Sequence, residues 1–322
     1  MKQFRYVIVA GVALLSGIAA AQDYPNRPIR YIVPQAPGGS SDTLARALTQ
    51  RVGDSLGQTI VIDNRPGATG VIGAEAVARA NPDGHTLLQA ATSHATNPAM
   101  HAKLPYDTVR DFAPISLLSQ QPNIWIVTPS LPVKTMKELI AYVKARPGQL
   151  NFGSSGTGGS QHLAGELLKS MAGIDMTHIP YKGSPPALID LLAGRIPIMS
   201  STMPPVLPHL RAGKVRALAV TSARRSSAVP DVPTVAESAL PGYEAIAWQG
   251  LLAPAGTPRA AIARLQSEFA RVLKQPEIAS RLTDQGYETV ASTPEWFAQY
   301  INTEIAKWTK VIRAAGIKSG EG

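Results

Sequence analysis

Short apolar segments alternate with amphipathic segments over the first part of the chain. Residues 29–33 are rich in Ile, Val and Tyr, as is typical of a buried strand. Aliphatic residues then recur at the spacing of one helix face, and we expect Ser40 or Ser41 to cap this helix, with Asp42 in its first turn. The alternation predicts an α/β fold with a mostly parallel sheet covered on both faces. The predicted elements are strands at 29–33, 60–62 and 85–91, a helix carrying Leu44, Leu48, Val52 and Leu56, and a helix at 72–80.

The same alternation resumes further along the chain and predicts a second, smaller set of strands and helices. A segment rich in Pro and Ser at 226–241 follows this set, and it indicates a connector that returns to the first set. The second set comprises strands at 124–127, 150–152, 196–199 and 215–220, and helices at 135–144, 162–171 and 186–192.

The last part of the chain adds a strand at 245–253 and helices at 258–274 and 277–285. Thr293, Pro294 and Glu295 then form a start signal for a long final helix. The apolar residues of this helix recur at helical spacing, so we expect it to pack on the first set of elements as ordinary core: Phe297, Ile301, Ile305, Trp308 and Ile312.

The N-terminus has the layout of a cleaved signal peptide over residues 1–21. Lys2 and Arg5 precede an apolar run at 6–18 that is too short to span a bilayer, and three alanines at 19–21 suit the cleavage site. The sequence contains no cysteine, which excludes disulfides and a lipid-modified cysteine. These features predict a protein that is exported to the periplasm and diffuses there, and we expect a monomer.

The charge of the chain is moderately basic, with 31 Lys and Arg residues against 22 Asp and Glu residues and a formal net charge of +9. The positive residues are scattered, and Arg224 with Arg225 forms the densest pair. No nucleic-acid partner is predicted from this pattern. A basic surface of this kind can steer anionic ligands toward the protein.

Two glycine-rich turns, at 34–42 and 151–162, each follow a short apolar strand and open a helix. Glycine lets backbone amides approach a ligand closely, and serine and threonine add hydroxyl donors. The first turn of a helix also presents unpaired N–H groups with partial positive charge. Both turns are therefore suited to hold an anion, and their distance in sequence suggests two lobes that face one ligand.

Residues that would support catalysis do not form a recognised motif. The serines at 154 and 155 lack the G-x-S-x-G pattern, and Gln161 stands where a dinucleotide fingerprint needs its third glycine. Lys182 precedes Gly183, which inverts the order of a P-loop, and no two of the six histidines lie four residues apart. We therefore expect that the protein is not an enzyme and that it has no cofactor and no metal site. A serine hydrolase that uses Ser154 or Ser155, with His162 and Asp190 as triad partners, is a remote alternative.

From residue 34 onward the chain resembles the Bug-type solute-binding receptors of tripartite tricarboxylate transporters. The resemblance covers the whole length after the signal peptide, and it depends on an ordered set of short motifs. These are Pro37-Gly38-Gly39 with Asp42 and Arg46, Asn64-Arg65-Pro66-Gly67-Ala68, Asn81-Pro82-Asp83-Gly84, Gly153-Ser154-Ser155-Gly156 with His162-Leu163, Tyr181-Lys182-Gly183, Asp190-Leu191-Leu192, Pro230-Asp231-Val232-Pro233-Thr234, and Trp248 with Gly250, Ala253-Pro254 and Gly256-Thr257-Pro258.

The resemblance implies a two-lobed periplasmic binding protein of type II-like fold, in which two βα sheets are joined by a double-crossover hinge with the ligand cleft between them. We place the first lobe at 22–122 and 226–322, the second at 123–225, and the hinge at 119–123 and 220–228. Such a receptor captures a small organic carboxylate and delivers it to the permease subunits of the transporter. A sensor that signals to a membrane kinase is an alternative that the sequence leaves open.

The family's ligand pocket is expected at the two glycine-rich turns, where backbone N–H groups bind carboxylates without a cationic side chain. Residues at the carboxyl end of the strand at 85–91 are candidates because ligands bind at that edge of parallel sheets. Gln35 departs from the aromatic or apolar residue that such receptors often carry in this loop, and its polar amide favours a ligand with an extra polar group. The candidate ligand-binding residues are Gln35, Ala36, Gly38, Gly39, Ser40, Ser41, Asp42, Thr92, Ser93, His94, Ser154, Ser155, Gly156, Thr157, Gly158, Ser160, His162, Tyr181, Lys182, Asp190 and Trp248.

Overall fold

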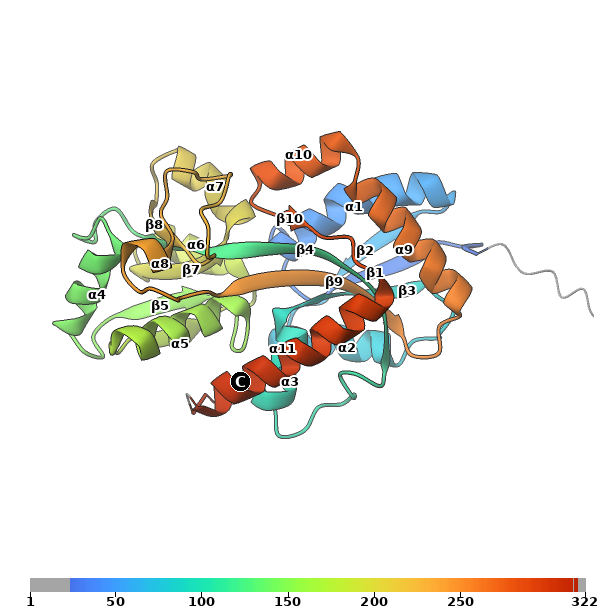
Figure 1. The fold of residues 1–322 in the computed structure, drawn as a ribbon, viewed down its shortest axis with the longest axis horizontal. Helices are drawn as coiled ribbons and strands as arrows, with labels where there is room; N and C mark the ends of the chain where they lie inside the picture. Colours follow the sequence, from blue (N-terminus) through green and yellow to red (C-terminus); the bar gives the residue numbers. More distant parts are fainter. Residues whose placement is uncertain (1–23, 315, 318–322) are drawn as a thin grey trace, which may run out of the picture.

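The computed structural model describes residues 24–314 and 316–317, and Figure 1 shows their arrangement in two lobes. The predicted signal peptide lies outside the described residues. Within the part of the chain that is described, no helix combines the length and the apolar character needed to cross a membrane.

The first lobe is built on a mixed sheet with the order β2-β1-β3-β9-β4. β1 pairs in parallel with β2 and β3, whereas β9 runs antiparallel to both β3 and β4. The mostly parallel arrangement predicted from the sequence is thus confirmed, since β9 alone among these five strands runs in the opposite direction. The strands are β1 (Ile29–Val33), β2 (Ile60–Asn64), β3 (Thr86–Ala91), β4 (Phe112–Val127) and β9 (Ile246–Pro254), and the short β10 (Glu288–Thr289) pairs with β4.

Helices cover both faces of this sheet. α1, α9 and α10 bury apolar side chains such as Leu48 and Phe269 against one face. α2, α3 and α11 bury Val77, Ala95 and Phe297 against the other face, so the predicted packing of the final helix on this lobe is confirmed. The helices are α1 (Ser40–Leu56), α2 (Val71–Ala78), α3 (Thr92–Met100), α9 (Arg259–Leu273), α10 (Pro276–Asp284) and α11 (Pro294–Ala314).

The second lobe repeats this layered design on a smaller scale. Its strands follow the order β4-β7-β5-β6, with β8 also paired to β4. One face packs on α4, α5 and α8 around Phe152, and the other packs on α6 and α7 around Met199. The elements are α4 (Met136–Lys144), β5 (Asn151–Ser154), α5 (Ser160–Ala172), β6 (Thr177–Pro180), α6 (Ser184–Leu192), β7 (Ile198–Thr202), α7 (Met203–Arg211), β8 (Arg216–Val220) and α8 (Val235–Ser238).

β4 belongs to both lobes and joins them without a break (Figure 1). Its residues up to Pro122 pair with β9, and those from Asn123 pair with β7 and β8. At this transition the Asn123 N–H donates to Thr221 Oγ1 (2.7 Å), and the Ala245 N–H donates to the Thr221 carbonyl (2.9 Å). The first hinge segment expected from the sequence therefore lies on this strand, while the return crossing falls at residues 245–246 and not at 220–228.

The segment expected to be a connector packs on the second lobe. Val235, Tyr243 and Ala245 share one core cluster with Trp125. We therefore propose that residues 123–245 form the second lobe and that the other described residues form the first, instead of a boundary at 226.

Proline content explains most of the elements that the sequence pattern did not predict. The first part of β4 contains Pro114 and Pro122, and its pairing with β9 shifts register after Pro114 and again after Leu117. α7 has two prolines directly after its first residue, where the first turn of a helix tolerates them, and a third at Pro208 inside the helix. Such a proline-rich segment does not look helical in the sequence. The predicted serine cap of α1 is wrong, because Gly39 occupies the N-cap position and no side chain caps the helix.

A buried and a half-buried histidine support the second glycine-rich turn. The rings of His162 and His178 stack with centroids 3.9 Å apart. The Gly158 N–H donates to His162 Nδ1 (2.9 Å), and Ser154 Oγ lies 2.6 Å from His178 Nε2. Burial, aided by the nearby Lys169 charge, lowers the pKa of His162 to about 4. Burial also lowers the pKa of His178 well below its usual value. Both rings are therefore neutral at neutral pH, as acceptance of the Gly158 N–H by His162 requires.

We expect His162→Asn to reduce the loss of stability in acid. The unfolded chain protonates this histidine below its ordinary pKa of 6.5, whereas the folded chain does so only near 4. Stability is therefore lost as the pH falls between these values, by at most about 1.4 kcal/mol per pH unit. Asparagine keeps an acceptor for Gly158 without titrating. Urea unfolding at several pH values should show a shallower slope for the variant, and equal slopes would contradict this assignment.

The contact between β9 and α11 leaves no room for a side chain at Gly250. A Cβ at this position would lie 2.1 Å from Phe297 Cζ. We expect Gly250→Ala to lower the free energy of unfolding by about 1–3 kcal/mol, because the buried ring cannot move freely. Urea titration measures this loss. Combining Gly250→Ala with Phe297→Leu should remove part of the penalty, and a strictly additive double variant would refute a steric cause.

Candidate functional site

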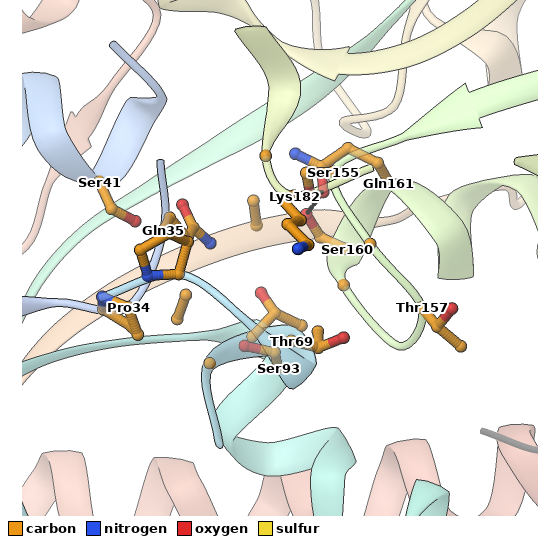
Figure 2. A pocket seen from close by; sticks show the side chains of 18 of the residues that line it. Pro34, Gln35, Ser41, Thr69, Ser93, Ser155, Thr157, Ser160, Gln161 and Lys182 are labelled. Carbon is orange, nitrogen blue, oxygen red and sulfur yellow. Dashed lines mark hydrogen bonds between the residues drawn. The ribbon is translucent and has the colours of Figure 1, made fainter. Parts of the chain in front are cut away.

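A cavity of about 340 Å³ lies between the two lobes. Its walls come from the segments that follow β1, β2 and β3 in the first lobe and β5, β6 and β7 in the second, with β9 along one side. Figure 2 shows Ser41, Gln35 and Ser93 on one side and Ser155, Ser160 and Lys182 on the other. The cavity thus lies where the carboxyl ends of strands from both lobes face each other, as expected for ligand sites in α/β sheets.

Several helices begin at the wall of this cavity. Ser40 and Ser41 of the first turn of α1 line it, and so do the N-cap residues of the other helices concerned. The starts of α1, α2, α3 and α5 carry partial positive charge from their unpaired N–H groups, and together they produce a site that favours an anion. α6 and α7 contribute fewer N–H groups, because each has two prolines in its first turn. These N-cap residues are Gly70 of α2, Ala91 of α3, Gly159 of α5, Gly183 of α6 and Thr202 of α7.

The side chains of the cavity add positive charge and no negative charge. No Asp or Glu is among the lining residues. Lys182 is exposed and projects from the second lobe toward the side of the cavity where Gln35 lies (Figure 2). His101 also lines the cavity, and burial lowers its pKa, which favours the neutral ring. This distribution of side-chain charge around the cavity fits a small anionic ligand.

About half of the residues proposed from the sequence lie on the cavity wall. Those from the first lobe belong to the segments after β1 and β3, and Trp248 belongs to β9. The second glycine-rich turn and the segment after β6 provide the others. The predicted residues that line the cavity are Gln35, Ser40, Ser41, Thr92, Ser93, Ser155, Gly156, Thr157, Ser160, Tyr181, Lys182 and Trp248.

The remaining candidates from the first lobe lie outside the lining and shape the turns. Asp42 Oδ2 accepts hydrogen bonds from the Gly38 N–H and from Arg46 Nε, both at 2.9 Å. Burial opposes ionisation, but these bonds keep the pKa of Asp42 below its usual value. Ala36 contacts the opposite lobe at Gly183, and Gly39 is the N-cap of α1.

His94, also predicted as a ligand contact, lies in the core of the first lobe. Its Nε2 is 3.1 Å from the Thr108 carbonyl oxygen, and its ring packs against Tyr106 and Phe112. Burial lowers the pKa of this histidine to about 4. Its place in the fold is therefore that of a neutral core residue.

The remaining candidates from the second lobe stabilise the loops behind the cavity. Ser154, Gly158 and His162 belong to the hydrogen-bonded histidine pair described above. Asp190 Oδ2 accepts from the Tyr181 hydroxyl (2.8 Å), and its Oδ1 accepts from Arg195 Nη1 (2.6 Å). Desolvation and then this carboxylate raise the pKa of Tyr181 to about 12, so the phenol stays protonated.

The serines, histidines and Asp190 do not form a catalytic triad. Ser155 Oγ donates to Gln161 Oε1 (2.5 Å), and the fully buried Ser154 does not line the cavity. Asp190 bonds to Tyr181 and Arg195 and not to a histidine. A nucleophile, base and orienting acid are therefore not aligned at the cavity. Among the described residues, no group of His, Cys, Asp and Glu is arranged to hold a metal ion.

Sequence reasoning missed the segment after β2 and several residues from β7 and β9. Residues 66–70 line the cavity, as do Thr202, Ala247 and Gln249. The turn at 64–68 had been noted only as a motif. The rule that ligands bind at the carboxyl edge of parallel strands, applied to the end of β3, points equally to this loop. No local sequence signal distinguishes Thr202 or Gln249.

The two lobes contact each other beside the cavity. Thr96 Oγ1 of α3 donates to the Gly158 carbonyl of the second lobe (2.6 Å). A Cβ on Gly158 would lie 3.1 Å from Met100 Cγ, and one on Gly183 would lie 3.1 Å from Ala36 Cβ. Glycine therefore permits a close approach of the lobes at both positions.

Comparisons with known proteins agree with this architecture. The family model described as "Tripartite tricarboxylate transporter family receptor" matches residues 44–317. Protein BugT of Bordetella pertussis is 39% identical over 324 residues, which cover 99% of each chain. A protein of the UPF0065 group from Pseudomonas sp. (strain P51), in the tcbD-tcbE intergenic region, is 37% identical over 95% of this chain and 93% of its own length.

Solved structures give the same result. The periplasmic binding protein BugD is 34% identical with a TM-score of 0.88, covering 92% of this chain and 100% of its own. R. palustris Rpa4515 with adipate is 39% identical with a TM-score of 0.89 over 92% and 99% of the two chains. MatC from Rhodopseudomonas palustris, with bound malate, is 36% identical with a TM-score of 0.85 over 90% and 100%. The chain therefore belongs to the tripartite tricarboxylate transporter receptor family, whose members are two-lobed periplasmic solute-binding proteins.

Proposed function

We propose that this protein captures a small organic carboxylate in the periplasm and delivers it to the membrane subunits of a tripartite tricarboxylate-type transporter. The observation that carries the proposal is the convergence of helix starts from both lobes on one cavity without acidic side chains. Backbone N–H groups and hydroxyls at such starts bind carboxylate oxygens through short, charge-assisted hydrogen bonds.

The relatives support a carboxylate over other anions. Two structures that are more than a third identical to this chain contain adipate and malate. The matched family is described as a transporter receptor, which favours delivery to a permease over signalling to a kinase. Export through the signal peptide at residues 1–21 and a monomeric state belong to the same proposal.

Ligand binding without turnover is the expected behaviour. A thermal-shift screen of the mature protein should identify a stabilising acid among succinate, malate, glutarate, adipate, citrate and aromatic acids. At one hundred times its dissociation constant, a ligand stabilises the fold by about 2.7 kcal/mol. Mass spectrometry after denaturation serves as the control for ligand that co-purifies. The absence of both a thermal shift and a released acid would refute the proposal.

Closure of the lobes is expected to contribute to affinity through Thr96. Thr96 itself does not line the cavity, and Thr96→Val removes the hydroxyl that bonds to the Gly158 carbonyl across the lobes, together with a longer bond (3.2 Å) to the Ser93 carbonyl within α3. One neutral hydrogen bond contributes about 0.5–1.5 kcal/mol, so Kd should rise by roughly 2- to 13-fold. Thr303→Val is the matched control, since its hydroxyl donates to Gln299 within α11. Titration calorimetry with the stabilising acid measures the Kd of both variants and of the wild-type protein. A Kd of Thr96→Val equal to that of the wild-type protein would contradict the role of Thr96 in closure.

A further inference from the structure

Two buried hydroxyls on the cavity wall have no hydrogen-bond partner among the described residues. Ser41 is 0% exposed and Thr202 is 2% exposed, and Ser41 Oγ and Thr202 Oγ1 both remain unpaired. Both residues line the cavity. A buried hydroxyl without a partner destabilises the fold, unless a ligand provides one. Among the unpaired buried hydroxyls, these two are therefore placed to meet an oxygen atom of a ligand in the cavity.

Each hydroxyl lies at the start of a helix that belongs to a different lobe. Ser41 is in the first turn of the 17-residue helix α1, and Figure 2 shows its side chain pointing from that helix toward Gln35. Thr202 ends β7 and is the N-cap of the 9-residue helix α7, where it caps no backbone N–H. Pro204 and Pro205 lack N–H groups, so the hydroxyl of Thr202 is an important donor at this helix start.

The two helix starts lie next to each other across the lobe boundary. Thr43 of α1 and Pro204 of α7 line one surface hollow. The segment before β10 contacts both helices, because the Tyr287 hydroxyl donates to the Ser40 carbonyl (2.6 Å) and Gly286 adjoins Met203. The starts of α1 and α7 are therefore close to each other, with residues 286–287 packed against both.

Neighbouring polar side chains already have partners within the protein. Gln249 Nε2 donates to Ser40 Oγ (3.0 Å), and Gln249 Oε1 accepts from Ser119 Oγ (2.8 Å). Ser160 Oγ donates to Asn123 Oδ1 (3.1 Å). Ser40 and Thr92 accept bonds through their hydroxyl oxygens, so Ser41 and Thr202 are the buried hydroxyls of this wall that have no partner of either kind among the described residues.

We infer that Ser41 and Thr202 donate hydrogen bonds to one carboxylate of the ligand, so that a single group is held by both lobes. The inference rests on the proposed function and extends its site from the glycine-rich turns to α7. An ionised carboxylate is an acceptor with two oxygens, which matches one hydroxyl donor from each lobe. Because the group bridges the lobes, its binding favours their closed arrangement.

A double-mutant cycle tests this bridge. Titration calorimetry compares the wild-type protein with Ser41→Ala, Thr202→Val and the double variant, using succinate, malate, glutarate and adipate as probes. Each single substitution removes a hydrogen bond to a charged group and should raise Kd about 10- to 100-fold. The Kd of the double variant should rise by less than the product of the two single-variant fold-changes, because both hydroxyls hold the same group. Thr202→Ser should retain binding.

Ser200→Ala is the matched control. Ser200 lies on the same strand as Thr202, is 0% exposed and has an unpaired Oγ, but it does not line the cavity. Its Kd should equal that of the wild-type protein. Without ligand, the melting temperatures of Ser41→Ala and Thr202→Val should stay the same or rise, since each removes an unpaired buried hydroxyl.

The outcomes separate this inference from the proposed function. An unchanged Kd for Thr202→Val would overturn the inference that both hydroxyls bind one carboxylate. Fold-changes in Kd that simply multiply in the double variant would overturn it as well. Either result would leave the proposed carboxylate receptor in place. A lower melting temperature of the ligand-free variants would assign the hydroxyls to the fold and also overturn the inference. A wild-type protein that binds none of the four acids and releases no acid on denaturation would refute the proposed function, and the inference with it.

Discussion

Backbone hydrogen bonding along β4 is the constraint on which the rest of the structure depends. This strand pairs with β9 in the first lobe and with β7 and β8 in the second, so one continuous segment sets the orientation of both sheets. Thr221 fastens the transition by bonding to Asn123 and to the segment that returns at Ala245. Because main-chain bonds have fixed directions, we expect motion between the lobes to be concentrated at this transition.

The cavity follows from that geometry. The carboxyl ends of the parallel strands in each lobe point toward the other lobe, so the helices that follow them begin around one space. The resulting positive potential comes largely from backbone dipoles, which recognise an oxygen anion but not the rest of the ligand. Apolar and polar side chains on the wall, such as Trp248 and Gln35, are then left to discriminate among ligands.

The alternation of strands and helices could be read from the sequence because most elements bury one face or both. Prediction failed where local chemistry opposed the final structure. Prolines concealed the first part of β4 and the helix α7, and tertiary pairing overrode their unfavourable propensity. The connector expected at 226–241 is anchored by Val235 and Tyr243, whose partners in the second lobe lie far away in sequence.

By itself, the sequence determined that this is an α/β protein with two glycine-rich turns suited to anions and without a recognised catalytic motif. Only the tertiary structure decided which residues of those turns reach the ligand space. Ser41 lines the cavity whereas the adjacent Asp42 holds the turn, and Ser155 lines it whereas the adjacent Ser154 bonds to a histidine. Thr202 also lines the cavity, although it ends a strand that carries no recognised motif. Composition and spacing predict an element, but the direction of each side chain depends on how that element packs against distant partners.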